Sequence, residues 1–262
     1  MIIPFVFLFI LHHEEATLDH IAKTAVGFNS VIANREKVPG KRSFFLSPFL
    51  EYSFLDLNLL KFSARADIPF GTVQNKLYFS DIAGTIKTTL DIKVLSLTPM
   101  VSTEFPTGGT LATSGHIGLL PAIAFEIHTG PIMHIHGIIG LKLPLGESHE
   151  TSPTGETDSH THHSTSDTTS NAHKINYIFP HSGKEIMSHV GMMLGILDII
   201  GIDIRPSFFL EDFKTFVFQP MGGLFADIPS GETSIKLHLY GFYATGGVRK
   251  GYGVGLMGYL MF

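Results

Sequence analysis

Polar and apolar residues alternate along a segment near the middle of the chain. Between residues 132 and 143, His134, His136 and Lys142 share one parity, while the other parity holds only apolar residues and glycine. Successive side chains of a β-strand point to opposite faces. The segment therefore predicts a strand with one polar face and one wholly apolar face.

The same alternation recurs with the parity reversed between residues 59 and 68, where Lys61, Arg65 and Asp67 share one face. Each repeat of the pattern is close to the roughly 9 to 11 residues that a tilted strand needs to cross a bilayer. We predict twelve strands, at residues 22–34, 43–54, 57–69, 79–90, 92–105, 115–128, 131–144, 186–198, 202–210, 214–228, 233–244 and 251–262.

A strand with one apolar and one charged face suits either a transmembrane barrel or a soluble β-sandwich. The composition favours the barrel: 44% of the residues are hydrophobic, yet no apolar run reaches the roughly 20 residues of a membrane helix. The last segment, Gly258–Phe262, is a strand that ends in an aromatic residue. We therefore predict an all-β, antiparallel, up-and-down transmembrane barrel of a Gram-negative outer membrane.

An even number of strands places both ends of the barrel domain on the periplasmic side. Short turns are then expected at Leu55–Asp56, Asp91, Thr129–Gly130, Ile199–Gly201 and Pro229–Glu232, and longer loops at 34–41, 70–78, 106–114, 146–185, 211–213 and 245–250. The loop at 211–213 is as short as a turn. If 186–210 were one long bulged strand, the strand number would fall.

The N-terminus predicts export. Residues 2–11 have the length of a signal-peptide hydrophobic region and are too short to span a membrane as a helix. We assign residues 1–16 to a signal segment and 17–262 to a single barrel domain. The expected partners are outer-membrane lipid, a small-molecule solute and, through the C-terminal strand, the barrel-assembly machinery; the apolar outer face suits lipid or a sister subunit, so an oligomer stays open.

Charge and cysteine content exclude several other classes of protein. The net charge is −5 with no basic patch, which argues against a nucleic-acid partner. The chain has no cysteine, so it has no disulfide, thiol nucleophile or thiolate metal site. No cofactor is required by any motif in the sequence.

Strand parity also predicts which polar side chains face the lumen. The set is Glu51, Lys61, Arg65, Asp67, Asp81, Lys87, Glu104, Glu126, His128, His134, His136, Lys142, Asp203, Arg205, Lys236 and His238. A twelve-strand barrel is narrow, so charges of both signs either line a selective path or pair with one another and plug it. A plugged barrel would serve as a scaffold for its loops or release an apolar ligand sideways through the wall.

The loop from Glu147 to Lys184 is rich in serine, threonine and histidine. Imidazole is a common ligand of zinc, copper and nickel, and the spacing of the histidines lets two or three rings converge. The candidate ligands for Zn or Cu are His149, His160, His162, His163 and His173. The alternatives are a tight site, weak capture of divalent metal, or a loop whose polar residues only keep it hydrated.

The histidines of the lumen raise a similar question. His134 and His136 share a face, and His128 and His116 belong to the neighbouring predicted strand, with Glu126 expected near His134. They suit either a metal-binding or proton-linked cluster or a structural hydrogen-bond network.

Catalysis is not expected. Outer-membrane phospholipases are barrels of similar size, but their chemistry needs a serine two residues from a histidine on one strand face. No His-x-Ser pair occurs on a clear strand here, and Ser188–His189 are adjacent residues, which point to opposite faces.

Several short motifs resemble a known family. They are Phe105–Gly109, Gly115–Leu119, Leu143–Gly146, the hairpin at 44–69 and the glycine-rich last strand. In these the chain resembles the outer-membrane transporter family labelled MetA-pathway of phenol degradation. The resemblance implies passage of hydrophobic or aromatic small molecules across the outer membrane. We thus predict a channel or transporter for small solutes with a metal-capturing loop, the alternative being a metal-binding or structural surface barrel with a plugged lumen.

Overall fold

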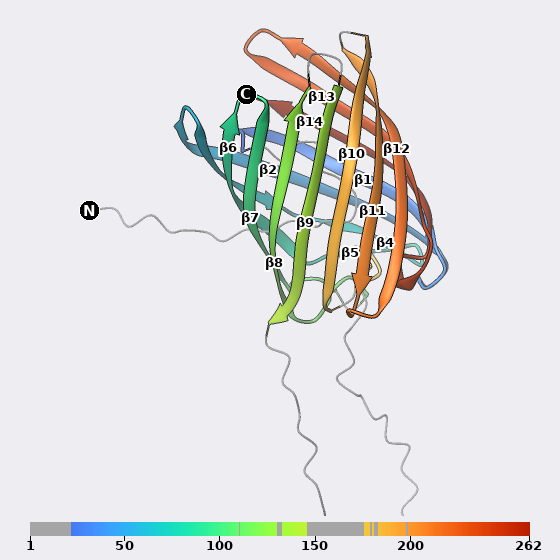
Figure 1. Cartoon of the computed structure of the whole chain (residues 1–262). Helices are drawn as coiled ribbons and strands as arrows, with labels where there is room; N and C mark the ends of the chain where they lie inside the picture. Colours follow the sequence, from blue (N-terminus) through green and yellow to red (C-terminus); the bar gives the residue numbers. More distant parts are fainter. Residues whose placement is uncertain are drawn as a thin grey trace, which may run out of the picture.

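The computed structural model describes residues 22–109, 111–129, 133–145, 176–178, 180, 183–197 and 199–262. The strands form a barrel around a central axis (Figure 1). Their bounds are β1 Ala25–Arg35, β2 Arg42–Leu57, β3 Leu60–Asp67, β4 Phe70–Val73, β5 Lys76–Phe79, β6 Ile82–Ile92, β7 Leu95–Phe105, β8 Ile117–His128, β9 Met133–Leu145, β10 Glu185–Leu197, β11 Ile200–Glu211, β12 Thr215–Ser230, β13 Thr233–Ala244 and β14 Gly251–Met261; a short 3-10 helix, η1, spans Gly247–Arg249.

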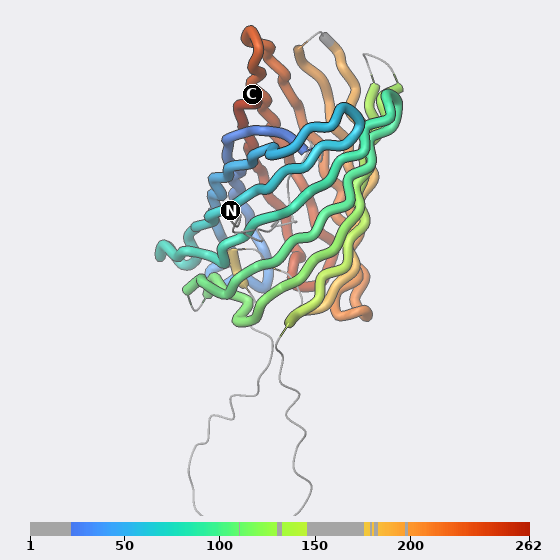
Figure 2. Tube along the Cα trace, turned by 90° about the vertical axis from the view of Figure 1, so that its left-hand side faces the viewer, coloured from blue at the N-terminus to red at the C-terminus, as the bar shows by residue number. Residues whose placement is uncertain are grey.

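The sheet closes on itself because β1 pairs with both β2 and β14. The β1–β14 register runs from Ala25 opposite Met261 to Arg35 opposite Gly251. The first strand therefore begins, and the last strand ends, at the rim that carries the short turns, as expected. Figure 2 shows the strands running obliquely across the wall. The tilt is that required to close a sheet into a barrel.

The described strands occupy twelve positions around the barrel. β3 and β4 follow one another along β2, pairing with residues 49–57 and 43–46 respectively, so they share one position. β5 and β6 pair with β4 and β3 in the same way and share the next. The predicted fold class and strand number are confirmed.

The expected loop at 70–78 is wrong, because the structure continues there as the β4–β5 hairpin. Gln74 and Asn75 at its tip have φ of 53° and 60°. Two consecutive residues with positive φ make the tight turn whose twist matches that of a hairpin. The adjacent strands are thereby extended beyond the predicted rim.

Two of the short turns lie two or three residues later than predicted. β2 continues to Leu57, with Asn58 (φ 59°) in the turn, and β6 continues to Ile92, with Lys93 (φ 52°) in the turn. Asn tolerates positive φ well, but Lys gives no such signal. β10 ends at Leu197 and β11 begins at Ile200 as its antiparallel partner, so the alternative of one long strand over 186–210 is excluded. The predicted connection at 211–213 separates β11 from β12.

The outer face of the barrel is apolar over its whole circumference. Large side chains such as Ile32, Ile123 and Leu224 are 65%, 54% and 54% exposed, while the charged residues of alternate parity are buried. Such a surface is stable against hydrocarbon and not against water. Among the described residues, no helix is long and apolar enough to cross a membrane.

Candidate functional site: the barrel lumen

The residues predicted to face the lumen fall into two groups. The larger group is buried, namely Glu51, Arg65, Asp67, Asp81, Lys87, Glu104, His136, Lys142, Asp203, Arg205 and His238. The remainder are half-buried and line a cavity at the end of the barrel that carries the short turns, which we call the turn end; the opposite end is the loop end. They are Lys61, Glu126, His128, His134 and Lys236. Their role in transport stays a prediction.

Charged side chains of opposite sign form ion pairs between strands on the inner face of the barrel wall. Lys87 Nζ donates to Glu51 Oε2 at 3.0 Å, and Ser63 Oγ donates to Glu51 Oε1 at 2.7 Å. Lys142 Nζ lies 2.7 Å from both carboxylate oxygens of Glu104. Charges removed from water are stable only when they are paired and hydrogen-bonded. The lumen wall is therefore polar but largely neutralised.

Arg65 and Asp67 form a two-pronged pair on one strand. Arg65 Nε and Nη2 donate to the two carboxylate oxygens of Asp67 at 2.9 and 2.7 Å. The guanidinium also lies over the ring of Phe49, 3.8 Å from its centroid. A planar guanidinium suits both contacts at once, which lysine would not.

Asp203 is the centre of a buried polar cluster. Its carboxylate accepts a hydrogen bond from Arg205 Nη2 at 2.9 Å and lies 3.1 Å from His136 Nε2. His238 Nε2 is 3.6 Å away. Three strands, β9, β11 and β13, thus contribute to one buried site on the lumen side of the wall. The arrangement supports the structural-network interpretation for His136.

The cluster needs a glycine on the intervening strand β12. A Cβ on Gly223 would lie 2.7 Å from His238 Nε2 and 2.9 Å from the Cα of Tyr240, whereas a Cβ on the adjacent Gly222 would meet nothing closer than 3.6 Å. We expect Gly223→Ala to reduce the free energy of unfolding by about 1–3 kcal/mol, as overpacking does. Gly222→Ala is the matched control and should be neutral. Urea unfolding in lipid vesicles, followed by circular dichroism, measures both; equal losses would contradict the prediction.

A second cluster lies at the loop end. Arg249, in η1, donates from Nη1 to Glu211 Oε1 at 2.7 Å and from Nη2 to Glu185 Oε1 at 2.9 Å. Its guanidinium packs over Phe209, 4.1 Å from the ring centroid. One arginine from a loop thus joins β10 and β11 inside the barrel.

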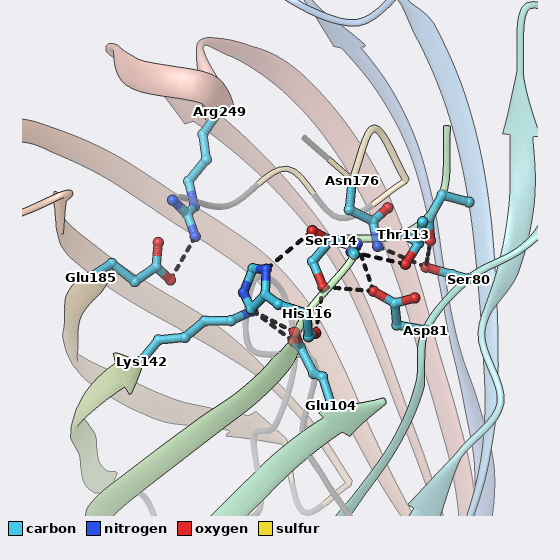
Figure 3. Close-up of polar contacts among 12 residues, drawn as sticks. Ser80, Asp81, Glu104, Thr113, Ser114, His116, Lys142, Asn176, Glu185 and Arg249 are labelled. Carbon is cyan, nitrogen blue, oxygen red and sulfur yellow. Dashed lines mark hydrogen bonds and ion pairs between the residues drawn. The ribbon is translucent and has the colours of Figure 1, made fainter. Parts of the chain in front are cut away.

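The connection between β7 and β8 enters the lumen at the same end. We call its described residues, 106–109 and 111–116, the inner segment. Asp81 holds it: one carboxylate oxygen accepts from Gly108 N at 3.0 Å, and the other accepts from Ser114 N and Ser114 Oγ at 2.8 and 2.9 Å. Figure 3 shows Ser114 beside Asp81, joined to it by these hydrogen bonds, with Glu104 and Lys142 nearby. The neighbouring Ser80 Oγ donates to Ala112 O at 2.9 Å.

A second piece of chain packs on the inner segment. Asn176 Nδ2 donates to Ser80 Oγ at 2.9 Å (Figure 3), and Tyr177 N donates to Leu111 O at 3.0 Å. Ala112 and Ile178 join a buried apolar cluster with wall residues such as Phe45 and Phe242. The inner segment and residues 176–178 therefore occupy the loop end of the lumen together with the wall side chains that they contact.

The turn end contains a cavity of about 700 Å³, which we call the vestibule. Its lining combines three lysines, acidic residues and histidines with apolar and aromatic residues: Lys23, Lys61, Lys236, Asp56, Asp227, Glu126, His128, His134, Met193, Phe225, Met257, Tyr259 and Phe262. Lys236 Nζ lies 3.2 Å from Asp227 Oδ2, and Lys61 Nζ 3.8 Å from Asp56 Oδ2. A mixed lining of this kind suits a solute with an apolar body and a polar group.

The predicted group of histidines is divided by the structure. His128 and His134 face each other at the vestibule, with Nδ1 atoms 2.8 Å apart. His116 lies in the inner segment at the opposite end, where its Nδ1 is 3.1 Å from Ser114 O. Glu126 is opposite His136 in the β8–β9 register and not opposite His134. Placing His116 with the other histidines was wrong, because β8 begins only at Ile117.

The outer wall has an apolar groove of about 820 Å³ across β6 to β10. Its lining includes the outward-facing Pro99 and Pro121 and the inward-facing Met100, Ala122 and Gly140. Opposite the prolines the registers are interrupted: β6–β7 passes from Lys87–Met100 to Leu90–Leu97, and β8–β9 from Leu119–Leu143 to Ala122–Gly140. A proline cannot donate to a ladder, so the wall is locally weaker here.

The proposed metal ligands His149, His160, His162, His163 and His173 lie outside the described residues, as does the expected signal segment 1–16. Within the described part of the chain, no three His, Asp or Glu side chains converge as a metal-ligand set.

Sequence reasoning missed several residues of the lumen. All of them had been assigned to predicted loops; they are Glu185, Glu211, Arg249, Ser114 and Asn176. A charged residue directly at a strand end was the available signal for the two glutamates. No pattern marks a loop residue that folds back into a lumen.

Comparison with known proteins gives structural neighbours only. No family model and no curated protein sequence matches the chain. Similar solved structures include an outer membrane channel from Pseudomonas putida F1 (TM-score 0.60, 11% identity, 95% of this chain and 100% of that chain), the NanC porin (0.51, 8%, 90% and 98%) and the KdgM porin, solved with oligogalacturonate (0.50, 8%, 91% and 98%). This is the fold of bacterial outer-membrane barrels. It agrees with the apolar outer face of this barrel; the resemblance to the phenol-degradation transporter family stays a prediction.

Proposed function

We propose that the protein is an outer-membrane channel for small amphipathic solutes, including aromatic ones. The observation that carries the proposal is the vestibule, a cavity of about 700 Å³ at the turn end of a lumen walled by paired charges. Beyond it, the loop end is occupied by a short segment held through hydrogen bonds to Asp81. Such a segment can move without breaking the wall, unlike a core of packed strands.

The lining of the vestibule supports the class of solute. Phe225, Tyr259 and Phe262 offer aromatic surface, and the lysines and carboxylates beside them offer polar partners. Apolar surface binds the body of a solute, and a few polar groups orient it. A phenol or a small aromatic acid has both parts.

The outer groove favours a second candidate function, the sideways release of apolar solutes into the membrane. It joins outward-facing Pro99 and Pro121 to inward-facing Met100 and Ala122, where two ladders are interrupted. An apolar solute would then leave the lumen without passing the charged loop end.

Metal capture by the loop is a further part of the proposal. What supports it is the sequence alone, with His160, His162 and His163 close together. The ligands would be His149, His160, His162, His163 and His173, five of the six histidines of the loop, and the metal zinc or copper.

The test is planar-bilayer conductance of the refolded full chain, with and without micromolar zinc or copper. It is paired with uptake of phenol and benzoate by proteoliposomes. A deletion of residues 147–175 removes the five proposed ligand histidines and keeps Asn176–Ile178, which pack on the inner segment.

Conductance together with benzoate uptake supports the channel. Uptake of phenol by a barrel that does not conduct supports sideways release. Metal block that disappears with residues 147–175 supports capture by the loop. A folded barrel that neither conducts nor takes up either solute overturns both transport functions.

A further inference from the structure

His128 and His134 form an unusual pair at the rim of the vestibule. They are directly opposite one another in the β8–β9 register, and the Nδ1 atoms of the two rings are 2.8 Å apart. The rings are nearly perpendicular, at 83°, with centroids 5.0 Å apart. Both side chains are half-buried and line the cavity.

The backbone holds the two rings in place. Thr129, next to His128, donates from Oγ1 to Met133 O at 2.7 Å and so ties the two strands together beside the pair. His128 N donates to Val94 O of the neighbouring turn at 2.9 Å. Two ligands that are already positioned bind a shared ion more tightly than two independent ones, because the second bond forms within one molecule.

The separation of the nitrogens indicates which ions would fit. Two ligands that are cis on a square-planar or tetragonal ion, with bonds of about 2.0 Å, lie about 2.8 Å apart; on a tetrahedral ion such as zinc they lie about 3.3 Å apart. The 2.8 Å between the two Nδ1 atoms equals the tetragonal value, and it is also the length of the N–H···N hydrogen bond that the rings form without an ion. Copper(II) binds imidazole more strongly than the other divalent first-row ions.

The surroundings tolerate a cation. Lys236, which also lines the vestibule, has its ammonium group 3.2 Å from Asp227 Oδ2, so its charge is partly compensated. Glu126 and Asp56 add negative charge to the same cavity. Since no third side chain of the described residues completes a ligand set, water or a small solute in the vestibule would occupy the other positions.

We propose that His128 and His134 form a two-nitrogen site for a tetragonal divalent metal ion, copper(II) foremost, with exchangeable ligands facing the vestibule. This site is separate from the histidine-rich loop and does not depend on the proposed transport function.

The candidate metal ligands of the loop must be removed first, because they could bind copper themselves. In the full-length chain, His149, His160, His162, His163 and His173 are all replaced by glutamine, and this background is refolded in detergent. The probe is copper(II) iminodiacetate, whose chelator leaves only a few cis positions open to protein nitrogens. Binding is measured by titration calorimetry, and the ligands of the bound copper by electron paramagnetic resonance.

We expect the background to bind one copper per barrel with nitrogen hyperfine structure from two imidazoles. His128→Gln or His134→Gln should each weaken binding at least tenfold and remove one imidazole from the spectrum, within the range of about 10- to 100-fold seen when the shell around a metal is altered. His116→Gln is the matched control, because His116 belongs to the inner segment at the other end of the barrel, and it should change neither readout.

Two results would overturn the proposal. One is a folded background that binds no stoichiometric copper, which would leave a simple N–H···N hydrogen bond between the rings. The other is binding that persists unchanged in His128→Gln and His134→Gln. Circular dichroism of each variant ensures that a loss of binding reflects the ligands and not the fold.

Discussion

Replacing Asp81 by alanine is expected to raise the single-channel conductance several-fold. The Asp81 carboxylate accepts three hydrogen bonds from the inner segment, two of them from main-chain N–H groups. A hydrogen bond to a charged group contributes about 1.5–3 kcal/mol, so the loss of even one shifts the population of the docked segment by about tenfold or more. Planar-bilayer recordings of the full chain measure the change.

Two further variants test whether the loss of the hydrogen bonds to Asp81 causes the change in conductance. Asp81→Asn keeps one acceptor oxygen and should give an intermediate conductance. Asp91→Ala removes a carboxylate at the turn end, which accepts a hydrogen bond from Ser96 Oγ at 3.3 Å, and should leave conductance unaltered. If Asp81→Ala conducts like the unmodified chain while remaining folded, the inner segment does not limit the pore.

Replacing Arg249 by methionine is expected to give the largest loss of stability of any single lumen substitution. It would leave Glu185 and Glu211 buried without their common cation. Removing one partner of a buried ion pair typically costs 3–5 kcal/mol, about the range expected here. Urea unfolding in vesicles, followed by circular dichroism because the chain has no tryptophan, provides the measurement.

The next residue along the chain supplies the control. Lys250 Nζ lies 2.9 Å from Glu36 Oε2, but both side chains are well exposed, at 44% and 58%. Exposed pairs contribute about 0–1 kcal/mol, so Lys250→Met should shift the unfolding midpoint little. The double substitution Glu185→Gln with Glu211→Gln in the Arg249→Met background should recover part of the loss. Equal effects of Arg249→Met and Lys250→Met would show that the Arg249 cluster is not a buried anchor.

Strand parity predicted the architecture because one polar and one apolar face are imposed on every strand by lipid and lumen. The strand from 131 to 144 was found at Met133–Leu145, and the last strand at Gly251–Met261. Turns were predicted less well, because positive φ falls on Lys93 and Gln74, residues that carry no turn signal. The β4–β5 hairpin was missed for the same reason.

Pairing of the charges could not be predicted, because it depends on register and on which loops enter the barrel. Parity placed Asp203, Arg205 and His136 on inward faces, but only the register between β9, β10 and β11 brings them together. Arg249 comes from a loop, so no periodicity could assign it to the lumen. The sequence left two alternatives, charges that line a selective path and charges that pair and plug the lumen. In the structure many of the charges pair with one another, and peptide segments occupy the loop end of the lumen.

The seam between β1 and β14 has a consequence for how such a barrel forms. The strand that begins at Ala25 is hydrogen-bonded to the strand that ends at Met261, so the pairing with the greatest sequence separation in the molecule is the one that completes the ring. Contacts of that kind form slowly, since most of the chain must be ordered first. Until then two bare sheet edges are exposed to any neighbouring strand. The first and last strands would therefore need protection by a chaperone or insertase for longer than the other strands, until the barrel closes.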